Sequence, residues 1–214
     1  MSNLIYHTLY FARELSGASM ARDKVDLGIM DAIYKRCSVR SFSPKQLDQS
    51  TIRTLLAAAV RAPTAVHLEP WVFAIIQDTS ALKRLSDRAK PLFLEEVQRA
   101  HLDREGHSLD MFASPNFNMF QNAGTLIIIC GKPLGPFVAA DCWLAAENLM
   151  LAASSLGLGT CVIGSAVPAL NTEEIKAELG IAQELTVIAP IIVGAPAGKT
   201  TPTARKEPEI LFWK

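Results

Sequence analysis

Arg36-Cys37-Ser38-Val39-Arg40 is the stretch around which the rest of this chain is organised. It follows a short helical pattern over residues 29–34, and we predict that it continues as extended backbone. Side chains alternate along extended backbone, so Arg36, Ser38 and Arg40 share one face and the residues between them face the protein. Two guanidinium groups and a hydroxyl suit a phosphate, because arginine donates paired, charge-assisted hydrogen bonds to such anions. A solvated basic edge is the alternative interpretation.

The composition is that of a globular protein without electrostatic bias. The chain has 214 residues, of which 50% are hydrophobic and 20% are charged, and 21 basic residues balance 21 acidic ones. This length is enough to bury a sizeable core. Nucleic acids and anionic membranes are bound by surfaces with a basic surplus. We therefore expect neither a nucleic-acid nor a membrane partner.

The cysteines and the start of the chain indicate a cytoplasmic protein. The 4 cysteines have irregular spacing and form no C-x-x-C pair, so neither a disulfide framework nor a zinc site is indicated. A reduced compartment is the default for such a pattern. The N-terminus lacks the basic and then apolar segments of a signal peptide. The longest apolar runs, residues 126–130 and 187–193, are too short to span a bilayer.

Hydrophobic periodicity predicts an α+β domain with few strands and many helices. Short apolar runs bounded by turn residues are typical of buried strands, and helical periodicity fills most of the segments between them. This pattern favours a mixed sheet with helices on both faces. The predicted strands cover residues 71–77, 125–131, 160–163 and 185–193, and the main predicted helices cover residues 29–34, 48–60, 79–105, 140–156 and 171–180.

Several of these helices have explicit boundary signals. Asp48 or Ser50 opens the second helix. Residues 171–174 form a capping box for the last helix, which Gly180 closes. Pro91 is expected to interrupt the helix over residues 79–105, because proline removes a backbone donor from a helix interior.

Apolar side chains gather in three places where we expect them to be buried, either in the core or against another surface. Ile29 and Ile33 are expected on the buried face of the first helix. The helix over residues 140–156 is apolar on nearly all sides, which is typical of a core centre or a subunit interface. Residues 210–213 form an apolar chain end after a proline-rich linker, and we expect this end to dock, with a partner subunit as one option.

The motifs of common catalytic sites do not occur. The chain has no G-x-G-x-x-G after a strand, no G-x-x-x-x-G-K-[ST], no G-x-S-x-G and no H-E-x-x-H. The 4 histidines are scattered without metal-ligand spacing. We therefore assign no metal and no catalytic side chain. If the protein is an enzyme, a bound organic cofactor carries its reaction.

Four motifs, in a particular order and at particular separations, give the chain a resemblance to a known family. They are Arg36-Cys37-Ser38-Val39-Arg40, Ala62-Pro63-Thr64-Ala65 with Pro70-Trp71, residues 157–164, and Arg205-Lys206. Together they resemble the FMN-dependent nitroreductase family over about residues 26–210. The resemblance implies a mainly antiparallel sheet and an intertwined homodimer with FMN at the subunit interface. It also implies ping-pong reduction by NADH or NADPH.

The resemblance implies roles for the charged motif residues. Arg36 and Ser38 are similar to the family's contacts to the FMN phosphate and ribityl chain. Arg40 resembles the cation near N1 and O2 of the flavin, where a fixed charge favours the anionic reduced form. Arg205, with Lys206, matches a second cation on the phosphate.

Two further motifs match loops against the flavin ring. Ile163, Gly164 and Ser165 match the family's turn that offers a backbone N–H to flavin N5, the atom that gives and takes hydride, and the resemblance implies that Gly164 permits close approach there. The other is laid along the flavin by the second subunit. The cofactor-binding residues that the resemblance implies are Arg36, Cys37, Ser38, Arg40, Pro63, Thr64, Ala65, His67, Ile163, Gly164, Ser165, Arg205 and Lys206.

The chain departs from the family pattern near the flavin. The family most often has Asn, one residue and then Gln before the Pro-Trp pair, where this chain has His67 and Glu69. Histidine titrates near neutral pH, and a glutamate adds negative charge. Residues 107–120 form the family's most variable segment. There, Phe117 and Phe120 are predicted to wall the open flavin face as a substrate pocket, with a core position as the alternative.

The sequence thus predicts an FMN-dependent NAD(P)H oxidoreductase. It would pass two electrons by hydride transfer through flavin N5 to a nitroaromatic, a quinone or a similar small-molecule acceptor. A flavin carrier or sensor of the same fold, and a different flavin reaction such as enone reduction or dehalogenation, are the alternatives. We predict an N-terminal helix or arm over residues 1–25, an FMN-binding domain over 26–196, and a C-terminal arm over 197–214 that completes the FMN site and the dimer.

Overall fold

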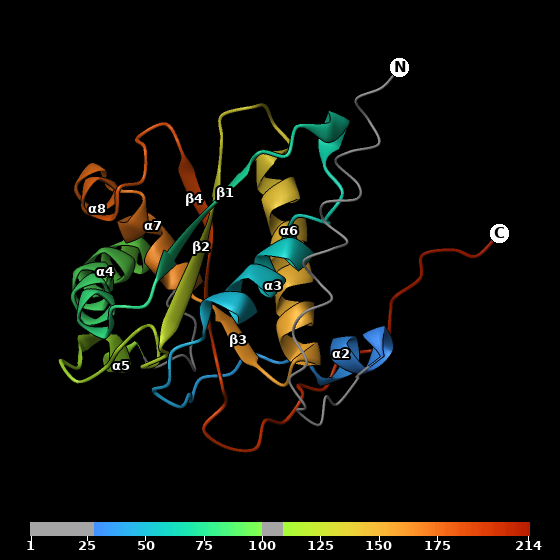
Figure 1. Cartoon of the computed structure of the whole chain (residues 1–214), viewed down its shortest axis with the longest axis horizontal. Helices are drawn as coiled ribbons and strands as arrows, with labels where there is room; N and C mark the ends of the chain where they lie inside the picture. Colours follow the sequence, from blue (N-terminus) through green and yellow to red (C-terminus); the bar gives the residue numbers. More distant parts are fainter. Residues whose placement is uncertain (1–27, 100–108) are drawn as a thin grey trace.

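The computed structural model describes residues 28–99 and 109–214. The predicted N-terminal arm over residues 1–25 lies outside these ranges and stays a prediction. The elements of the described chain (Figure 1) are α2 (Ile29–Lys35), α3 (Gln49–Ala59), the 3-10 helix η1 (Ala65–His67), β1 (Trp71–Ile76), α4 (Thr79–Arg99), α5 (Asp110–Ala113), β2 (Thr125–Gly131), α6 (Val138–Ser155), β3 (Gly159–Val162), the 3-10 helix η2 (Gly164–Ala166), α7 (Val167–Leu170), α8 (Glu173–Leu179) and β4 (Thr186–Gly194).

The strands form one sheet in the order β1-β2-β4-β3. Every neighbouring pair in this sheet is antiparallel, with Ile128 of β2 opposite Ala74 on one side and Pro190 on the other. A parallel bridge between Ser38 and Thr160 adds the 36–40 stretch to the β3 edge. The predicted α+β fold with a mixed, mainly antiparallel sheet is therefore confirmed.

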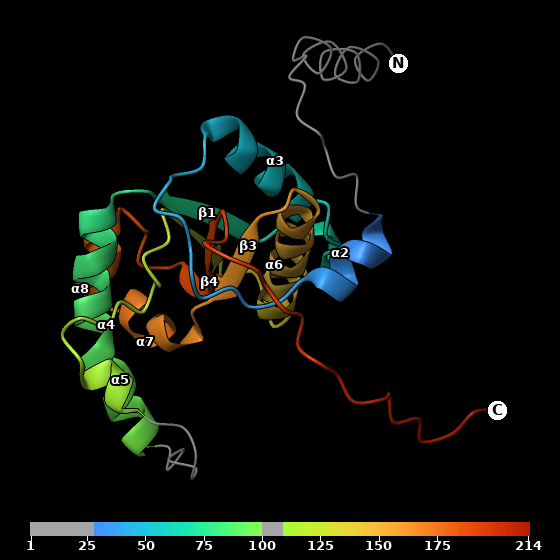
Figure 2. The same ribbon diagram turned by 90° about the horizontal axis from the view of Figure 1, so that it is seen from below.

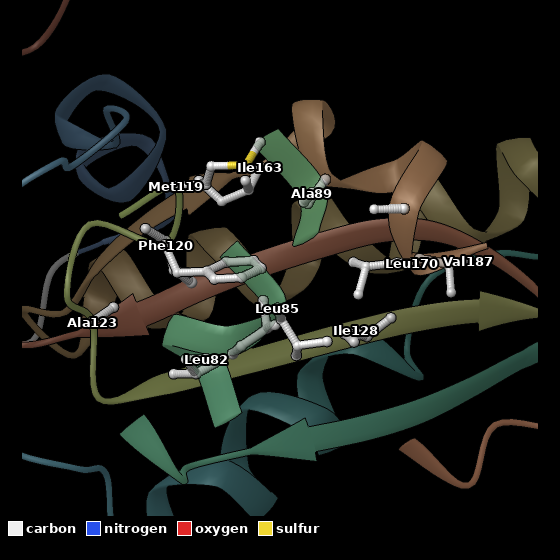
Figure 3. Close-up of a cluster of buried hydrophobic side chains, with 14 of the residues drawn as sticks. Leu82, Leu85, Ala89, Met119, Phe120, Ala123, Ile128, Ile163, Leu170 and Val187 are labelled. Carbon is white, nitrogen blue, oxygen red and sulfur yellow. The ribbon is translucent and has the colours of Figure 1, made fainter. Parts of the chain in front are cut away.

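Helices cover both faces of this sheet (Figure 1). On one face, α6 and α3 pack against the sheet around a cluster that includes Leu55, Ile127 and Leu149. The other face carries α4 and α7, and its cluster includes Leu82 and Phe120 (Figure 3). Every residue of β2 is buried, as expected for a strand covered on both sides.

Helix α4 runs without a break through Pro91, so the predicted interruption is wrong. Proline removes one hydrogen bond from a helix interior and strains the preceding turn. Both halves of α4 bury apolar side chains, with Leu85 before the proline and Val97 after it. This packing keeps the two halves in one helix. The hydrophobic periodicity of the sequence does not show that both halves are packed. Residues 100–105, where we predicted the helix to end, lie outside the described ranges.

Helix α8 is capped one residue later than predicted. The hydroxyl of Thr172 accepts a hydrogen bond from the backbone N–H of Ile175. Asn171 has a different role, because its side chain accepts from the Val187 N–H at 2.8 Å and donates to the Val187 carbonyl at 2.9 Å. Asn171 therefore holds the start of β4. Gly180 ends the helix in the left-handed conformation, as predicted.

Apolar side chains lie exposed at several places in the single chain. Helix α2 buries Ala32 but leaves Ile29 71% exposed and Ile33 also exposed, so the prediction that both isoleucines face the core of one chain is wrong. The apolar residues 210–213 are exposed in an arm that extends away from the body (Figure 2). Such surfaces commonly mark interfaces. No helix within the described residues has the length and apolar content needed to cross a membrane.

Candidate functional site

The 36–40 stretch leaves α2 and lies along the edge of β3. The Val39 N–H donates to the Thr160 carbonyl at 2.9 Å, next to the bridge between Ser38 and Thr160. The side chain of Val39 is buried against Gly159, where an added Cβ would lie 2.7 Å from a valine methyl carbon. Glycine is therefore required at 159 for this close approach. The contact fixes the stretch to the sheet.

Two grooves flank this stretch. Ser38, Arg40 and Lys199 line one groove, which has a volume of about 270 Å³. Arg36 lines the other groove, of about 180 Å³, and Cys37 lines both. The structure thus brings Ser38 and Arg40 into one groove and Arg36 into the neighbouring one.

The three polar residues of the stretch also act on the pKa of one buried thiol. Burial raises the pKa of Cys161, and the positive charge of Arg40, the Ser38 hydroxyl and the charge of Arg36 oppose this rise. Arg36 is mostly buried, with a side chain 19% exposed, and its Nε lies 4.0 Å from Oε1 of Glu147. Positive charge therefore gathers at this edge of the sheet.

Lys199 is a candidate site residue that the sequence analysis missed. It follows β4 in the run of residues 198–201, Gly-Lys-Thr-Thr, and lines the same groove as Arg40. The signal was present in the sequence, because a cation between a glycine and two threonines offers charge, hydroxyls and accessible backbone N–H groups. The predicted cations Arg205 and Lys206 are exposed and line neither groove in the single chain.

The turn after β3 presents open backbone. The Ile163 N–H donates to the Pro190 carbonyl at 2.9 Å, and the Ala166 N–H donates to the Ile163 carbonyl at 3.0 Å. These bonds fix both ends of the turn. Gly164 lies between them, exposed, and an added Cβ there would meet no atom within 4 Å. Ser165 is half-buried. The turn therefore leaves room for a flat group above its backbone.

The loop that contains Pro63, Thr64, Ala65 and His67 is conformationally strained. Val66 has a φ of 46°, His67 of 56° and Glu69 of 45°, all in the left-handed region that non-glycine residues avoid. The Ala65 N–H donates to Oδ1 of Asp141 at 3.1 Å. This bond joins the loop to the first turn of α6 (Figure 1).

This loop and the 36–40 stretch lie at opposite ends of α6. Asp141 in the first turn of the helix holds the loop, whereas Ser154 in the last turn donates to the Ala32 carbonyl at 3.2 Å, just before the stretch. A helix rises about 1.5 Å per residue, so the two contacts lie about 20 Å apart. Arg36 reaches α6 between them, at Glu147, and no hydrogen bond or ion pair of the described residues joins the 36–40 stretch to the loop within one chain.

The two predicted pocket phenylalanines lie in different surroundings. Phe120 is 0% exposed and belongs to the core near Met119 and Ile163 (Figure 3). The prediction that Phe120 walls a pocket is therefore wrong, since a ring without exposed surface lines no cavity. Phe117 is half-buried and packs edge-on against Phe112, with ring centroids 5.1 Å apart. Its contact with a ligand stays a prediction.

Metal ligands do not gather in the described part of the chain. No group of three or more His, Cys, Asp or Glu side chains in residues 28–99 and 109–214 is placed to hold a metal ion. His67 is the histidine within these ranges, and His7, His101 and His107 lie outside them. The charged side chains that line the described grooves are those of Lys35, Arg36, Arg40 and Lys199.

Comparison with known proteins assigns the family. The model of the Nitroreductase family matches residues 33–195, which is most of the chain. The chain belongs to the nitroreductase family. A protein of Archaeoglobus fulgidus named "Putative NADH dehydrogenase/NAD(P)H nitroreductase" is 27% identical over 169 residues, which cover 77% of this chain and 83% of that protein. The family resemblance inferred from the motifs is confirmed.

Other relatives of this nitroreductase-family chain extend the comparison. The crystal structure of a nitroreductase with bound FMN from Bacteroides fragilis has a TM-score of 0.73 and 26% identity, and the match covers 87% of this chain and 98% of that one. An iodotyrosine deiodinase from Thermotoga neapolitana is 24% identical over 135 residues, which cover 62% of this chain and 71% of that protein. Proteins named for different reactions therefore resemble this chain.

Proposed function

We propose that this member of the nitroreductase family is an FMN-dependent NAD(P)H oxidoreductase that reduces an electron-poor acceptor such as a nitroaromatic or a quinone. The observation that carries the proposal is the groove at which Ser38, Arg40 and Lys199 meet beside β3. Two relatives support it. The Bacteroides fragilis structure contains FMN, and the Archaeoglobus fulgidus protein is named for NAD(P)H nitroreductase activity.

The side chains of this groove fit a phosphate monoester. A guanidinium, an ammonium and several hydroxyls can donate hydrogen bonds to phosphate oxygens, and the two cations offset its charge. None of the described residues that line the groove is acidic. We assign the phosphate of FMN to Ser38 and Lys199, and the cation beside N1 and O2 of the ring to Arg40. Arg36, Arg205 and Lys206 remain proposed contacts.

When bound, FMN would supply two-electron hydride chemistry between a nicotinamide and an acceptor. The chain itself would bind and orient the cofactor, and its cations would compensate the negative charge that develops on it. A fixed guanidinium such as Arg40 stabilises negative charge that develops beside it, and this effect is stronger in a site from which water is excluded. The open backbone at Gly164 permits a ring to lie close to it.

We propose further that the working form is a homodimer. In one chain, α6 holds the loop through Asp141 and the residue Ala32 before the 36–40 stretch through Ser154, and these two contacts lie about 20 Å apart. A two-fold axis that sets two α6 helices antiparallel would bring the 36–40 stretch of one copy to the strained loop of the other. Apolar side chains that such an interface could cover are exposed on α2, on α6 and in the proposed C-terminal arm from residue 197: Ile29, Ile33, Trp143, Leu144, Leu211, Phe212 and Trp213.

The visible absorption spectrum of the purified protein tests the cofactor and the donor together. We expect a flavin spectrum that bleaches on anaerobic addition of NADH or NADPH and returns when a quinone or a nitroaromatic is added. A flavin that stays oxidised with both donors would favour a carrier or sensor. A protein that takes up no FMN would contradict the proposal. A panel of acceptors, including an enone and a halogenated phenol, then identifies the reaction.

Substitution of Arg40 tests the site. We expect Arg40→Ala to slow flavin reduction or lower the flavin potential, because the cation that offsets the developing charge is lost. Rapid mixing with NAD(P)H and a potential titration measure both quantities. Arg84→Ala is the matched control, since Arg84 is an exposed arginine on α4 that lines neither groove. Equal behaviour of the two variants would show that Arg40 is only part of a basic edge.

A further inference from the structure

We propose that Asp141 is a positioning residue that locks the strained loop of residues 64–69 onto the first turn of α6 and thereby holds it in the shape that binds cofactor. The cofactor part of this inference rests on the proposed function. The locking of the loop does not, because it concerns a contact within the described chain.

The loop needs an external constraint. Val66, His67 and Glu69 all have positive φ angles, and Val66 is β-branched, which makes this conformation especially unfavourable. Such conformations persist only where the surrounding structure enforces them. Within the loop, the Leu68 N–H donates to the Ala65 carbonyl at 3.2 Å. This bond closes a turn but does not attach the loop to the rest of the protein.

Asp141 supplies that attachment. Its Oδ1 accepts from the Ala65 N–H at 3.1 Å, and it is the one side chain that bonds to the backbone of residues 63–69 among the hydrogen bonds of the described chain. The carboxylate lies in the first turn of α6, where the helix dipole favours negative charge. The position of Asp141 is fixed in turn by its own N–H, which donates to the Phe137 carbonyl at 2.9 Å.

The burial of Asp141 argues that this bond has a function beyond stability. The residue is 4% exposed, and its Oδ2 has no hydrogen-bond partner among the described residues. A buried acceptor without a partner destabilises a fold, and an apolar side chain at this place would avoid that cost. Rule-breaking residues of this kind are expected at functional positions. The loop that Asp141 holds carries three of the residues that the family resemblance assigns to the flavin.

Two substitutions separate the bond from the charge. Asp141→Ala removes the acceptor, and we expect amide hydrogen exchange at Ala65 to become about tenfold faster or more and FMN to bind about tenfold more weakly. Asp141→Asn keeps a side-chain oxygen that can accept from the Ala65 N–H. We expect it to restore both quantities to within about threefold of the wild type.

Asp78→Ala is the matched control. Asp78 also accepts backbone hydrogen bonds at a helix start, from the Ser80 N–H at 2.9 Å, but it caps α4 and lines neither groove. We expect it to lower the melting temperature while leaving Ala65 exchange and FMN affinity unchanged.

The outcomes distinguish this inference from the proposed function. Wild-type values of Ala65 exchange and FMN affinity in Asp141→Ala would overturn the inference. Equal losses in Asp141→Asn and Asp141→Ala would overturn it too, because the retained acceptor would then have no effect. A wild-type protein that binds no FMN, with Ala65 exchange still faster in Asp141→Ala, would overturn the proposed function and support the locking of the loop.

Discussion

At the scale of single residues, the four cysteines differ in burial, and burial sets their reactivity. It raises the pKa of Cys130 to about 11 and that of Cys142 to about 11, and it raises the pKa of Cys161 as well. Cys37 is half-buried and lines both grooves. Because the thiolate is the reactive form, the three buried thiols are expected to be inert in the folded protein.

We predict that iodoacetamide at pH 8 modifies Cys37 and leaves the other cysteines intact. A thiol with a pKa near 11 is about one part in a thousand thiolate at this pH, and the fraction rises only as the pH approaches the pKa. Bound FMN is expected to slow the modification, since Cys37 borders the proposed phosphate groove. Peptide mass spectrometry locates the label, and Cys37→Ser is the control. Labelling of Cys130 in the folded protein would contradict the assignment.

At the scale of elements, α4 anchors the segment of residues 114–119, which packs beside it. Ser86 accepts a hydrogen bond from the Met119 N–H at 2.9 Å, and one turn further Lys90 donates to the Ser114 carbonyl at 3.2 Å. The rings of Phe93 and Phe112 pack with centroids 4.7 Å apart and extend this contact. The segment around Phe117 is therefore held by buried polar bonds as well as by packing.

We predict that Lys90→Ala lowers the free energy of unfolding by about 1–3 kcal/mol, because it leaves a part-buried carbonyl at Ser114 without its donor. Lys83→Ala is the matched control. Lys83 shares Asp87 with Lys90 but is exposed, so its loss should cost less than about 0.5 kcal/mol. Urea unfolding measures both. Equal losses of unfolding free energy in the two variants would mean that burial of the Lys90 ammonium contributes nothing to stability.

The sequence predicts elements well where the pattern is local. The strand at residues 125–131 matches β2, because its run of apolar residues is bounded by clear turn signals. The errors arise where contacts between residues far apart in the sequence determine whether a helix continues or a side chain is buried. Pro91 stays within α4 because both halves of that helix are packed, and Phe120 belongs to the core although its segment has no period. Lys199 joins Arg40 only because β4 ends beside the 36–40 stretch.

At the scale of the whole molecule, the apolar chain end is the feature that one copy leaves uncovered. Leu211 is 90% exposed, and Phe212 and Trp213 are exposed with it. Large apolar side chains so exposed are unfavourable in water. In the proposed dimer, this arm would lie on the partner and bury them.

We predict that deletion of residues 208–214 raises the dissociation constant of the homodimer by about tenfold or more, because the apolar contacts of the arm are lost. Analytical ultracentrifugation over a dilution series measures it. Removal of Lys214 alone is the control, since it shortens the arm but keeps its apolar residues. An unchanged dissociation constant in the longer deletion would show that the arm does not cover the partner.

The separation of Arg40 and Asp141 toward opposite ends of α6 has a genetic consequence. If each site takes its stretch from one subunit and its loop from the other, a hybrid of an Arg40→Ala subunit and an Asp141→Ala subunit gathers both lesions in one site and leaves the second site intact. Two impaired alleles would then partly complement each other. Random pairing of equal amounts would return about a quarter of the wild-type sites, since half of the dimers are hybrids and half of their sites are whole.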